Sequence, residues 1–265
     1  AYATIASMLP VWLLLQPRDY INGIQLIIGL CLLFAAVFIA NPTIVAPMYN
    51  TVVPEGTPPL LPLLFVTIAC GALSGFHGLV ASGTTSKQLD KEPDARFVGY
   101  LGSSGEGLLA LVTIIAVSAG FASLGEWQTV YAQFGGTIGI STFVAGGSQI
   151  VSDGLPLSQA FAATLLAVMA ILFAATTMDT GVRLQRFIIQ EWGTIYKIPA
   201  LQNGYIATFL AVAACLALAF GAGGADGQGG MLIWPLFGTT NQLLAGLTLL
   251  VISVMLVKLR RRYIF

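Results

Sequence analysis

The sequence has few charged residues. Asp, Glu, Lys and Arg make up 8% of its 265 residues, whereas hydrophobic residues make up 57%. A water-soluble domain carries about a quarter charged residues. This composition therefore excludes an ordinary soluble enzyme or binding module, and it predicts a protein whose surroundings are a lipid bilayer.

Cysteines and phosphate-binding motifs are also scarce. The three cysteines lie within apolar stretches, which excludes a disulfide framework and a cysteine-based metal centre. The chain has no Gly-x-x-x-x-Gly-Lys-Ser/Thr motif, so we do not expect ATP to drive its activity. We expect no cofactor, no metal and no nucleic-acid partner. The chain begins with Ala and lacks the basic start of a signal peptide, so we expect it to be part of a longer protein.

Long apolar stretches are abundant. Six of them are about 20 residues long, which lets a helix rising about 1.5 Å per residue cross a bilayer core of about 30 Å. The six predicted transmembrane helices cover residues 22–40, 60–82, 97–122, 157–178, 202–221 and 232–257. We therefore predict an all-α membrane protein with one transmembrane domain, residues 1–265.

The basic residues lie in alternate loops between these predicted helices. All 11 Lys and Arg residues occur before the first helix or after the second, fourth and sixth, and the other loops carry acidic residues only. Lys and Arg concentrate in loops that stay in the cytoplasm. Both ends of the chain are therefore predicted to face the cytoplasm.

Residues 123–156 fit neither a free loop nor a membrane-spanning helix. The segment contains four aromatic residues, Trp127, Tyr131, Phe134 and Phe143. It is therefore too apolar for a free loop, whereas its glycine pairs at 135–136 and 146–147 interrupt it too often for a span. We predict an outer re-entrant or interfacial helical hairpin that acts as a lid.

The end of the second predicted helix is polar and rich in glycine. It reads SGFHGLVASGTTSKQL from Ser74 to Leu89 and holds the only histidine, His77. Gly weakens a helix by about 1 kcal/mol relative to Ala, and transporters expose broken helices to substrate at membrane depth. We predict a break between Ser82 and Thr85. The substrate-binding candidates are Ser74, His77, Ser82, Gly83, Thr84, Thr85 and Ser86. Close helix packing through small residues is the structural alternative.

Polar and ionisable groups at membrane depth are also candidates for coupling transport to an ion. Imidazole takes up and releases protons near neutral pH, and a carboxyl held away from water favours its protonated form. Both groups therefore suit a proton carrier. The candidates for proton or ion coupling are His77, Glu106, Thr176 and Asp179.

Each of these positions has a structural alternative. His77 suits a hydrogen-bonded core position, and the Glu106 carboxyl suits a hydrogen bond to a neighbouring helix. Asp179 lies four residues before Arg183, which is the spacing of a helical ion pair. For Asn241, at the start of the last predicted helix, we favour capping or an interhelical hydrogen bond.

Four stretches resemble the carbon starvation protein A family of bacterial inner-membrane transporters, which take up peptides and, in some members, pyruvate. These stretches are WLLLQPRDYIN, SGFHGLVASGTTSKQLDKEPDARFVGY, MDTGVRLQRF and WPLFGTTNQLLA. The resemblance implies the second half of a leucine-transporter-like fold with two inverted repeats. It also implies a bacterial inner-membrane location, a missing amino-terminal half as a partner, a broken helix at residues 74–88 and an outer gate at residues 123–156.

The residues and the resemblance together predict a secondary active importer of a small anionic or peptide substrate, and not an enzyme. Proton coupling is expected from the resemblance and from His77 and Glu106, while sodium stays open because Thr hydroxyls and carbonyls suit it. A passive channel would need a continuous polar lining, whereas these polar residues cluster. A membrane sensor or subunit that binds without transporting stays an alternative. An intramembrane enzyme lacks a catalytic set. The sequence does not rank peptide against pyruvate.

Overall fold

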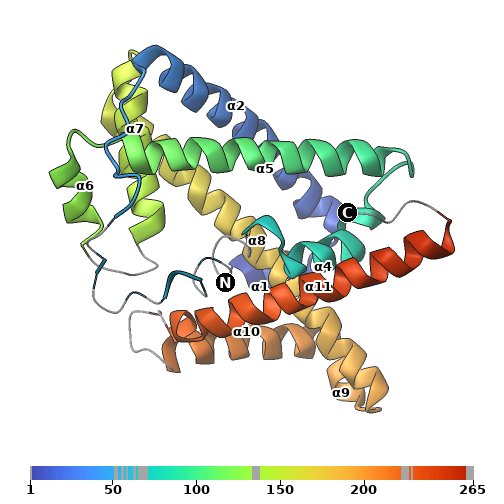
Figure 1. Ribbon diagram of the computed structural model, residues 1–265. Coiled ribbons are helices and arrows are strands. Elements are labelled where there is room, and N and C mark those ends of the chain that lie inside the picture. The colour runs from blue at the N-terminus through green and yellow to red at the C-terminus, as the bar shows by residue number, and fades with distance from the viewer. Residues whose placement is uncertain are drawn as a thin grey trace. The chain divides into compact units, whose positions relative to one another are not determined.

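The computed structural model describes residues 2–50, 53, 54, 57, 59–61, 64, 71–132, 138–221, 227 and 229–260, among which there are helices and loops but no strand (Figure 1). The chain divides into two compact units. Unit 1 comprises Ala1–Thr57 and Pro93–Asp179, and unit 2 comprises Pro58–Glu92 and Thr180–Phe265.

The described residues of unit 1 form five whole helices and the first part of a sixth. They are α1 (Tyr2–Met8), α2 (Gln16–Ala40), α5 (Asp94–Ala119), α6 (Leu124–Val130), α7 (Ile138–Gly154) and residues 159–179 of α8 (Gln159–Ile195). A π-helical turn, η1 (Val11–Leu15), precedes α2.

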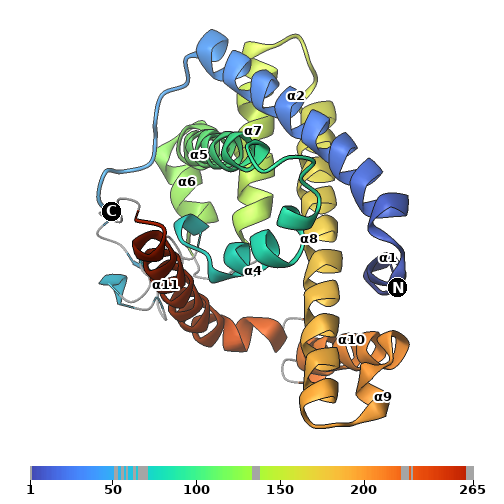
Figure 2. The same cartoon turned by 90° about the vertical axis from the view of Figure 1, so that its right-hand side faces the viewer.

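Helix α7 packs against both α2 and α5 (Figure 1, Figure 2). Its glycines allow this close approach. A Cβ added at Gly146 would overlap the Ala116 carbonyl oxygen of α5, and one added at Gly154 would lie 2.5 Å from the Ala36 carbonyl oxygen of α2. The resulting core draws on α2, α5, α7 and α8 and consists of Leu30, Leu33, Ala36, Val112, Ile150, Val151, Ala162, Leu166 and Met169.

The predicted hairpin at residues 123–156 consists of α6 and α7. The start of α6 is capped reciprocally, because Ser123 Oγ accepts from the Glu126 N–H at 3.3 Å and the Glu126 carboxylate accepts from the Ala122 N–H at 2.9 Å. The expectation that glycines 146–147 interrupt the segment is wrong, because they lie within α7 at its closest packing contacts. The pair at 135–136 lies outside the described residues. The re-entrant path stays a prediction.

Unit 2 contains the following elements: α4 (Gly75–Gly83), η2 (Thr85–Lys87), residues 180–195 of α8, α9 (Pro199–Gln202), α10 (Gly204–Gly221), η3 (Gly229–Ile233) and α11 (Trp234–Lys258). Helix α4 packs along α11 (Figure 1). A Cβ added at Gly75 would lie 2.6 Å from Leu244 Cβ of α11, and one at Gly78 would lie 3.0 Å from the Thr248 side chain. Small residues therefore set the separation of these two helices.

Among the described residues, five helical segments are long and apolar enough to cross a membrane. They are Trp12–Ala40, Asp94–Ala119, Gln159–Ile195, Gly204–Gly221 and Trp234–Lys258. They correspond to five of the six predicted spans. The remaining predicted span, residues 60–82, is described only in part, because residues 62, 63 and 65–70 lie outside the described residues. At its described end the helix is interrupted before α4, where Ser74 has extended backbone angles of φ −85° and ψ 122°.

Helix α8 is longer than predicted. The hydropathy pattern placed its end at residue 178 and assigned the basic residues that follow to a loop, whereas the helix continues to Ile195. Arg183 and Arg186 therefore lie on α8. The physical reason is that Leu, Gln and Arg are good helix formers and no Pro occurs between residue 178 and Pro199. The helix therefore continues beyond its apolar part.

The glycine contact between α7 and α5 leads to a stability prediction. Gly146→Ala forces a methyl group into the α5 backbone, and overpacking of this kind destabilises by about 1–3 kcal/mol. The control is Gly107→Ala on α5, where an added Cβ meets nothing within 4 Å. Thermal unfolding in detergent should show a lower Tm for Gly146→Ala only. Equal Tm values for the two variants would contradict the packing described here.

Candidate functional site

The N-terminal end of α4 is held by Asn241 of α11. The Phe76 N–H donates to Asn241 Oδ1 at 2.9 Å, and Asn241 Nδ2 donates to Ser74 Oγ at 3.2 Å. Gly75 fits between them because it has no side chain. The expected capping or interhelical role of Asn241 is therefore confirmed, since it caps α4 and joins that helix to α11.

His77 lies in the first turn of α4, and its side chain is exposed. Its ring stands edge-on to Phe76, with 6.5 Å between the ring centroids. Backbone N–H groups and the positive end of the helix dipole gather at this end of a helix, where they favour a negative group. His77 and Ser74 thus flank the end of α4 that has the right polarity for an anion.

The hydroxyl-rich stretch from Ser82 to Ser86 lies at the opposite end of α4. The helix ends at Gly83, within the predicted interval, and Thr84 leaves the helical conformation with φ −130° and ψ −57°. Ser82 Oγ donates to Leu79 O at 3.2 Å, and Ser86 Oγ donates to Ser82 O at 3.0 Å. Carbonyl oxygens give this end a negative partial charge. This polarity argues against the anion-holding role expected for Ser82, Gly83, Thr84, Thr85 and Ser86.

Glu106 and His77 belong to different units, with Glu106 on α5 of unit 1 and His77 on α4 of unit 2. Glu106 lies near the middle of α5, and its side chain is exposed. Residues on the other sides of this part of α5 are exposed as well. The role of Glu106 as a proton carrier held away from water stays a prediction.

Asp179 of α8 is fully buried and forms an ion pair with Arg18 of α2. Arg18 also pairs with Asp19 at 2.8 Å and donates to the Tyr2 hydroxyl at 3.2 Å. The sequence suggested only the local partner, Arg183, and the pairing with Arg183 stays a prediction. In the sequence, the feature that could have indicated an ion pair of Arg18 is the LQPRDY motif, which places this Arg beside an apolar stretch.

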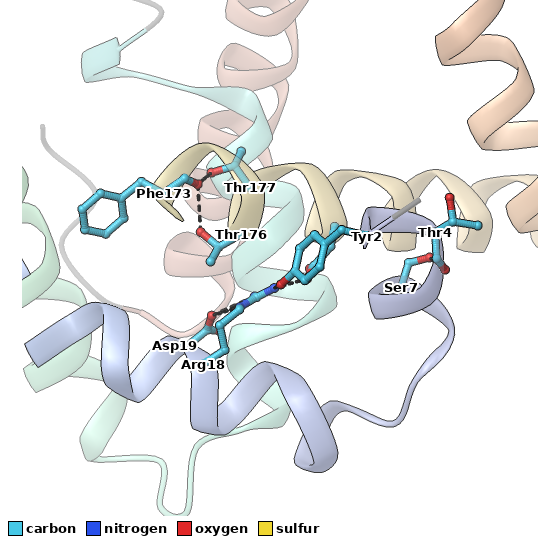
Figure 3. Close-up of polar contacts among 9 residues, drawn as sticks. Tyr2, Thr4, Ser7, Arg18, Asp19, Phe173, Thr176 and Thr177 are labelled. Atoms are coloured by element: carbon cyan, nitrogen blue, oxygen red, sulfur yellow. Dashed lines mark hydrogen bonds and ion pairs between the residues drawn. The ribbon is translucent and has the colours of Figure 1, made fainter. Parts of the chain in front are cut away.

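Thr176 and Thr177 lie three and two residues before Asp179 on α8. Both hydroxyls donate to Phe173 O, at 2.8 Å and 3.0 Å (Figure 3). A hydroxyl that donates to its own helix still offers oxygen lone pairs to a cation. Among the described residues, no three His, Cys, Asp or Glu side chains are grouped to hold a metal ion.

A pocket of 270 Å³ in unit 1 was not indicated by the sequence. It lies between the loop after α2 and the helix α6, and it is lined by Asn50, Pro54, Trp127, Gln128, Tyr131 and Ala132. The rings of Trp127 and Tyr131 are 4.7 Å apart, and the Trp127 indole N–H donates to Val117 O at 3.2 Å. Burial raises the pKa of the Tyr131 phenol. The spacing of these aromatic residues, four apart on a helix, is the signal that could have revealed the pocket.

The buried Arg18–Asp179 pair should contribute measurably to the stability of unit 1. Replacing Asp179 with Asn leaves a guanidinium without its buried counter-charge, which typically costs about 3–5 kcal/mol. Asp19→Asn is the matched control, because Asp19 is half-exposed and such pairs contribute less than about 1 kcal/mol. In thermal unfolding in detergent, the Tm of Asp179→Asn should be well below the Tm of Asp19→Asn. Similar Tm values would mean that the buried pair does not stabilise the fold.

Comparison with known proteins gives a consistent result. The family model described as "Carbon starvation protein CstA" matches residues 1–123 and 120–265. The "Peptide transporter CstA" of Helicobacter pylori (strain J99 / ATCC 700824) is 35% identical to this chain, over 98% of this chain and 45% of its own length. The protein of the same name in Escherichia coli (strain K12) is also 35% identical, over 98% of this chain and 45% of its own length.

A third relative carries a different name. The "Pyruvate/proton symporter BtsT" of Escherichia coli (strain K12) is 32% identical, over 98% of this chain and 46% of its own length. The chain therefore spans less than half the length of these relatives. No solved structure matches it.

Proposed function

The chain belongs to the carbon starvation protein CstA family, and from this membership we propose that it is part of a secondary active importer of peptides or pyruvate. The relatives are named transporters, and five helical segments of this chain suit a membrane. The observation that carries the proposal is the short, interrupted helix α4, anchored to α11 by Asn241. Transporters use such discontinuous helices to bind substrate at membrane depth.

The two ends of α4 are assigned different roles. A substrate carboxylate, which peptides and pyruvate share, binds at the N-terminal end beside Ser74 and His77, where the helix dipole is positive. The C-terminal end, with hydroxyls and carbonyls from Ser82 to Ser86, suits a positively charged group or a coupling cation. This division follows from the polarity of α4 and the hydrogen bonds at its ends.

Coupling to protons is assigned to His77 and Glu106. The support is that these groups can hold a proton at membrane depth and that one relative is named a pyruvate/proton symporter. Sodium is the second candidate, with Thr176 and Asp179 as ligands, because hydroxyl and carboxylate oxygens suit that ion. Asp179 is engaged by Arg18, which favours a role in holding α2 against α8 over a role as proton carrier.

In the proposed architecture the chain is the second half of a leucine-transporter-like fold in the bacterial inner membrane. The remaining, amino-terminal half supplies the other repeat, both ends of the chain face the cytoplasm, and α6 with α7 forms an outer gate. The support is the fraction of its relatives that the chain spans and the alternation of basic loops. The same fraction also favours one alternative, a membrane subunit that binds without transporting.

Uptake of labelled pyruvate or dipeptide into vesicles tests the transport proposal. Glu106→Gln should keep substrate binding but lose accumulation driven by a pH gradient, because Gln resembles the protonated state and cannot release a proton. Glu191→Gln is the control, an exposed carboxyl on α8. His77→Ala should weaken binding. Normal gradient-driven accumulation by Glu106→Gln would place the proton path elsewhere.

The topology is tested with reporter fusions. A fusion after Arg262 should report the cytoplasm and an insertion at Gly227 should report the outside, because Lys and Arg occur only in the loops on the side of Arg262. Alkaline phosphatase and green fluorescent protein give opposite signals in the two compartments. The reverse pair of signals would overturn the orientation.

A further inference from the structure

We propose that the pocket between the loop after α2 and the helix α6 binds an organic ammonium group, such as the amino end of a peptide. This aromatic pocket, named for the rings of Trp127 and Tyr131 in its wall, lies entirely within unit 1. It shares no residue with the two ends of α4, which belong to unit 2. Binding of the ammonium group is independent of transport, whereas a peptide as its natural source rests on the proposed function.

Both walls of the aromatic pocket are fixed to the end of α5. On one side, the N–H groups of Val45 and Ala46 in the loop after α2 donate to Ser118 O at 3.0 Å and 3.1 Å. On the other side, the Trp127 indole N–H donates to Val117 O at 3.2 Å. These bonds attach the loop and α6 to consecutive carbonyls of α5 (Figure 1). The space between the walls is therefore preformed, as most ligand pockets are.

Two polar side chains of the aromatic pocket are available to a ligand. Among the residues that the structure describes, neither the Tyr131 hydroxyl nor the Gln128 side-chain amide has a hydrogen-bond partner. Tyr131 is half-buried, and because burial raises the pKa of its phenol, the hydroxyl stays neutral and offers oxygen lone pairs. The Gln128 carbonyl oxygen is a second acceptor. A ligand that carries several N–H donors satisfies both groups.

The two rings give the pocket an aromatic surface that attracts a cation. The ring centroids of Trp127 and Tyr131 are 4.7 Å apart, and the bond to Val117 O holds the indole in place. The face of an aromatic ring is electron-rich and attracts a cation within about 6 Å of its centroid, with Trp the strongest. An ammonium group combines positive charge with N–H donors, so it suits the rings and the acceptors together.

The charges near the aromatic pocket favour a cation over an anion. The two segments that form its walls, residues 45–57 and 124–132, contain two Glu and no Lys or Arg. The two basic residues of unit 1 are Arg18 and Arg96. They lie in the first turns of α2 and α5, which at about 1.5 Å per residue is about 30 Å from the far ends of those helices. A carboxylate such as pyruvate therefore finds no positively charged side chain in the wall segments.

The fluorescence of Trp127 tests this site. The full chain carries Trp12→Phe, Trp192→Phe and Trp234→Phe, so that Trp127 is its only tryptophan. In detergent it is titrated with methylammonium, Ala-Ala, N-acetyl-Ala-Ala and pyruvate. We expect a saturable change in emission with methylammonium and Ala-Ala, and none with the other two compounds, because they lack the ammonium group. A saturable response to neither ammonium compound, or an equal response to N-acetyl-Ala-Ala, would overturn the proposal.

Variants at two tyrosines show whether the ligand binds in the aromatic pocket. Tyr131→Leu should raise the Kd of methylammonium about three- to tenfold, because it removes one ring and one acceptor. Tyr131→Phe keeps the ring beside Trp127 and should raise the Kd about twofold. Tyr49→Leu is the matched control, since Tyr49 is an exposed residue of the loop after α2 that does not line the pocket. Kd values for both Tyr131 variants equal to that of Tyr49→Leu would contradict the assignment.

Uptake measurements keep the failure of this site distinct from the failure of the transport proposal. Saturable binding of Ala-Ala at Trp127 without uptake of labelled dipeptide into vesicles would support the ammonium site and overturn the transport proposal. Uptake of the dipeptide without any response of Trp127 would overturn the ammonium site and leave the transport proposal intact.

Discussion

Backbone contact at glycine is the constraint on which unit 1 depends. In a bilayer there is no hydrophobic force to bring helices together, so they associate through close van der Waals packing and interhelical hydrogen bonds. Gly146 and Gly154 bring α7 against α5 and α2, and the buried core of unit 1 forms around these contacts. The glycines that weaken α7 as an isolated helix are therefore the residues that let it pack.

Polar groups follow the same constraint, because each needs a partner inside the protein. Asp179 pairs with Arg18, and the Phe76 N–H donates to Asn241. Both interactions join segments that are far apart in the sequence. Asp179 lies where an apolar stretch ends, and Phe76 lies where helix α4 begins. Glu106 differs, since its side chain is exposed on α5.

Helix polarity decides what the candidate site can bind. Small and hydroxyl residues occur at both ends of α4, so the composition alone predicts a single site there. They lie at opposite ends of the same short helix, and its N–H and carbonyl ends attract opposite charges. The anion is therefore assigned beside Ser74 and His77, and the hydroxyls of Ser82 and Ser86 are directed at backbone carbonyls.

The sequence by itself determined the membrane class, five of the spans, the family and the interval in which α4 ends, because hydropathy, charge alternation and glycine content are local properties. Only the tertiary structure decided that Arg18 pairs with Asp179 and that glycines 146–147 are packing contacts. The physical reason is that these features depend on which segments meet in space. Arg18 and Asp179 are 161 residues apart, and no spacing rule connects them.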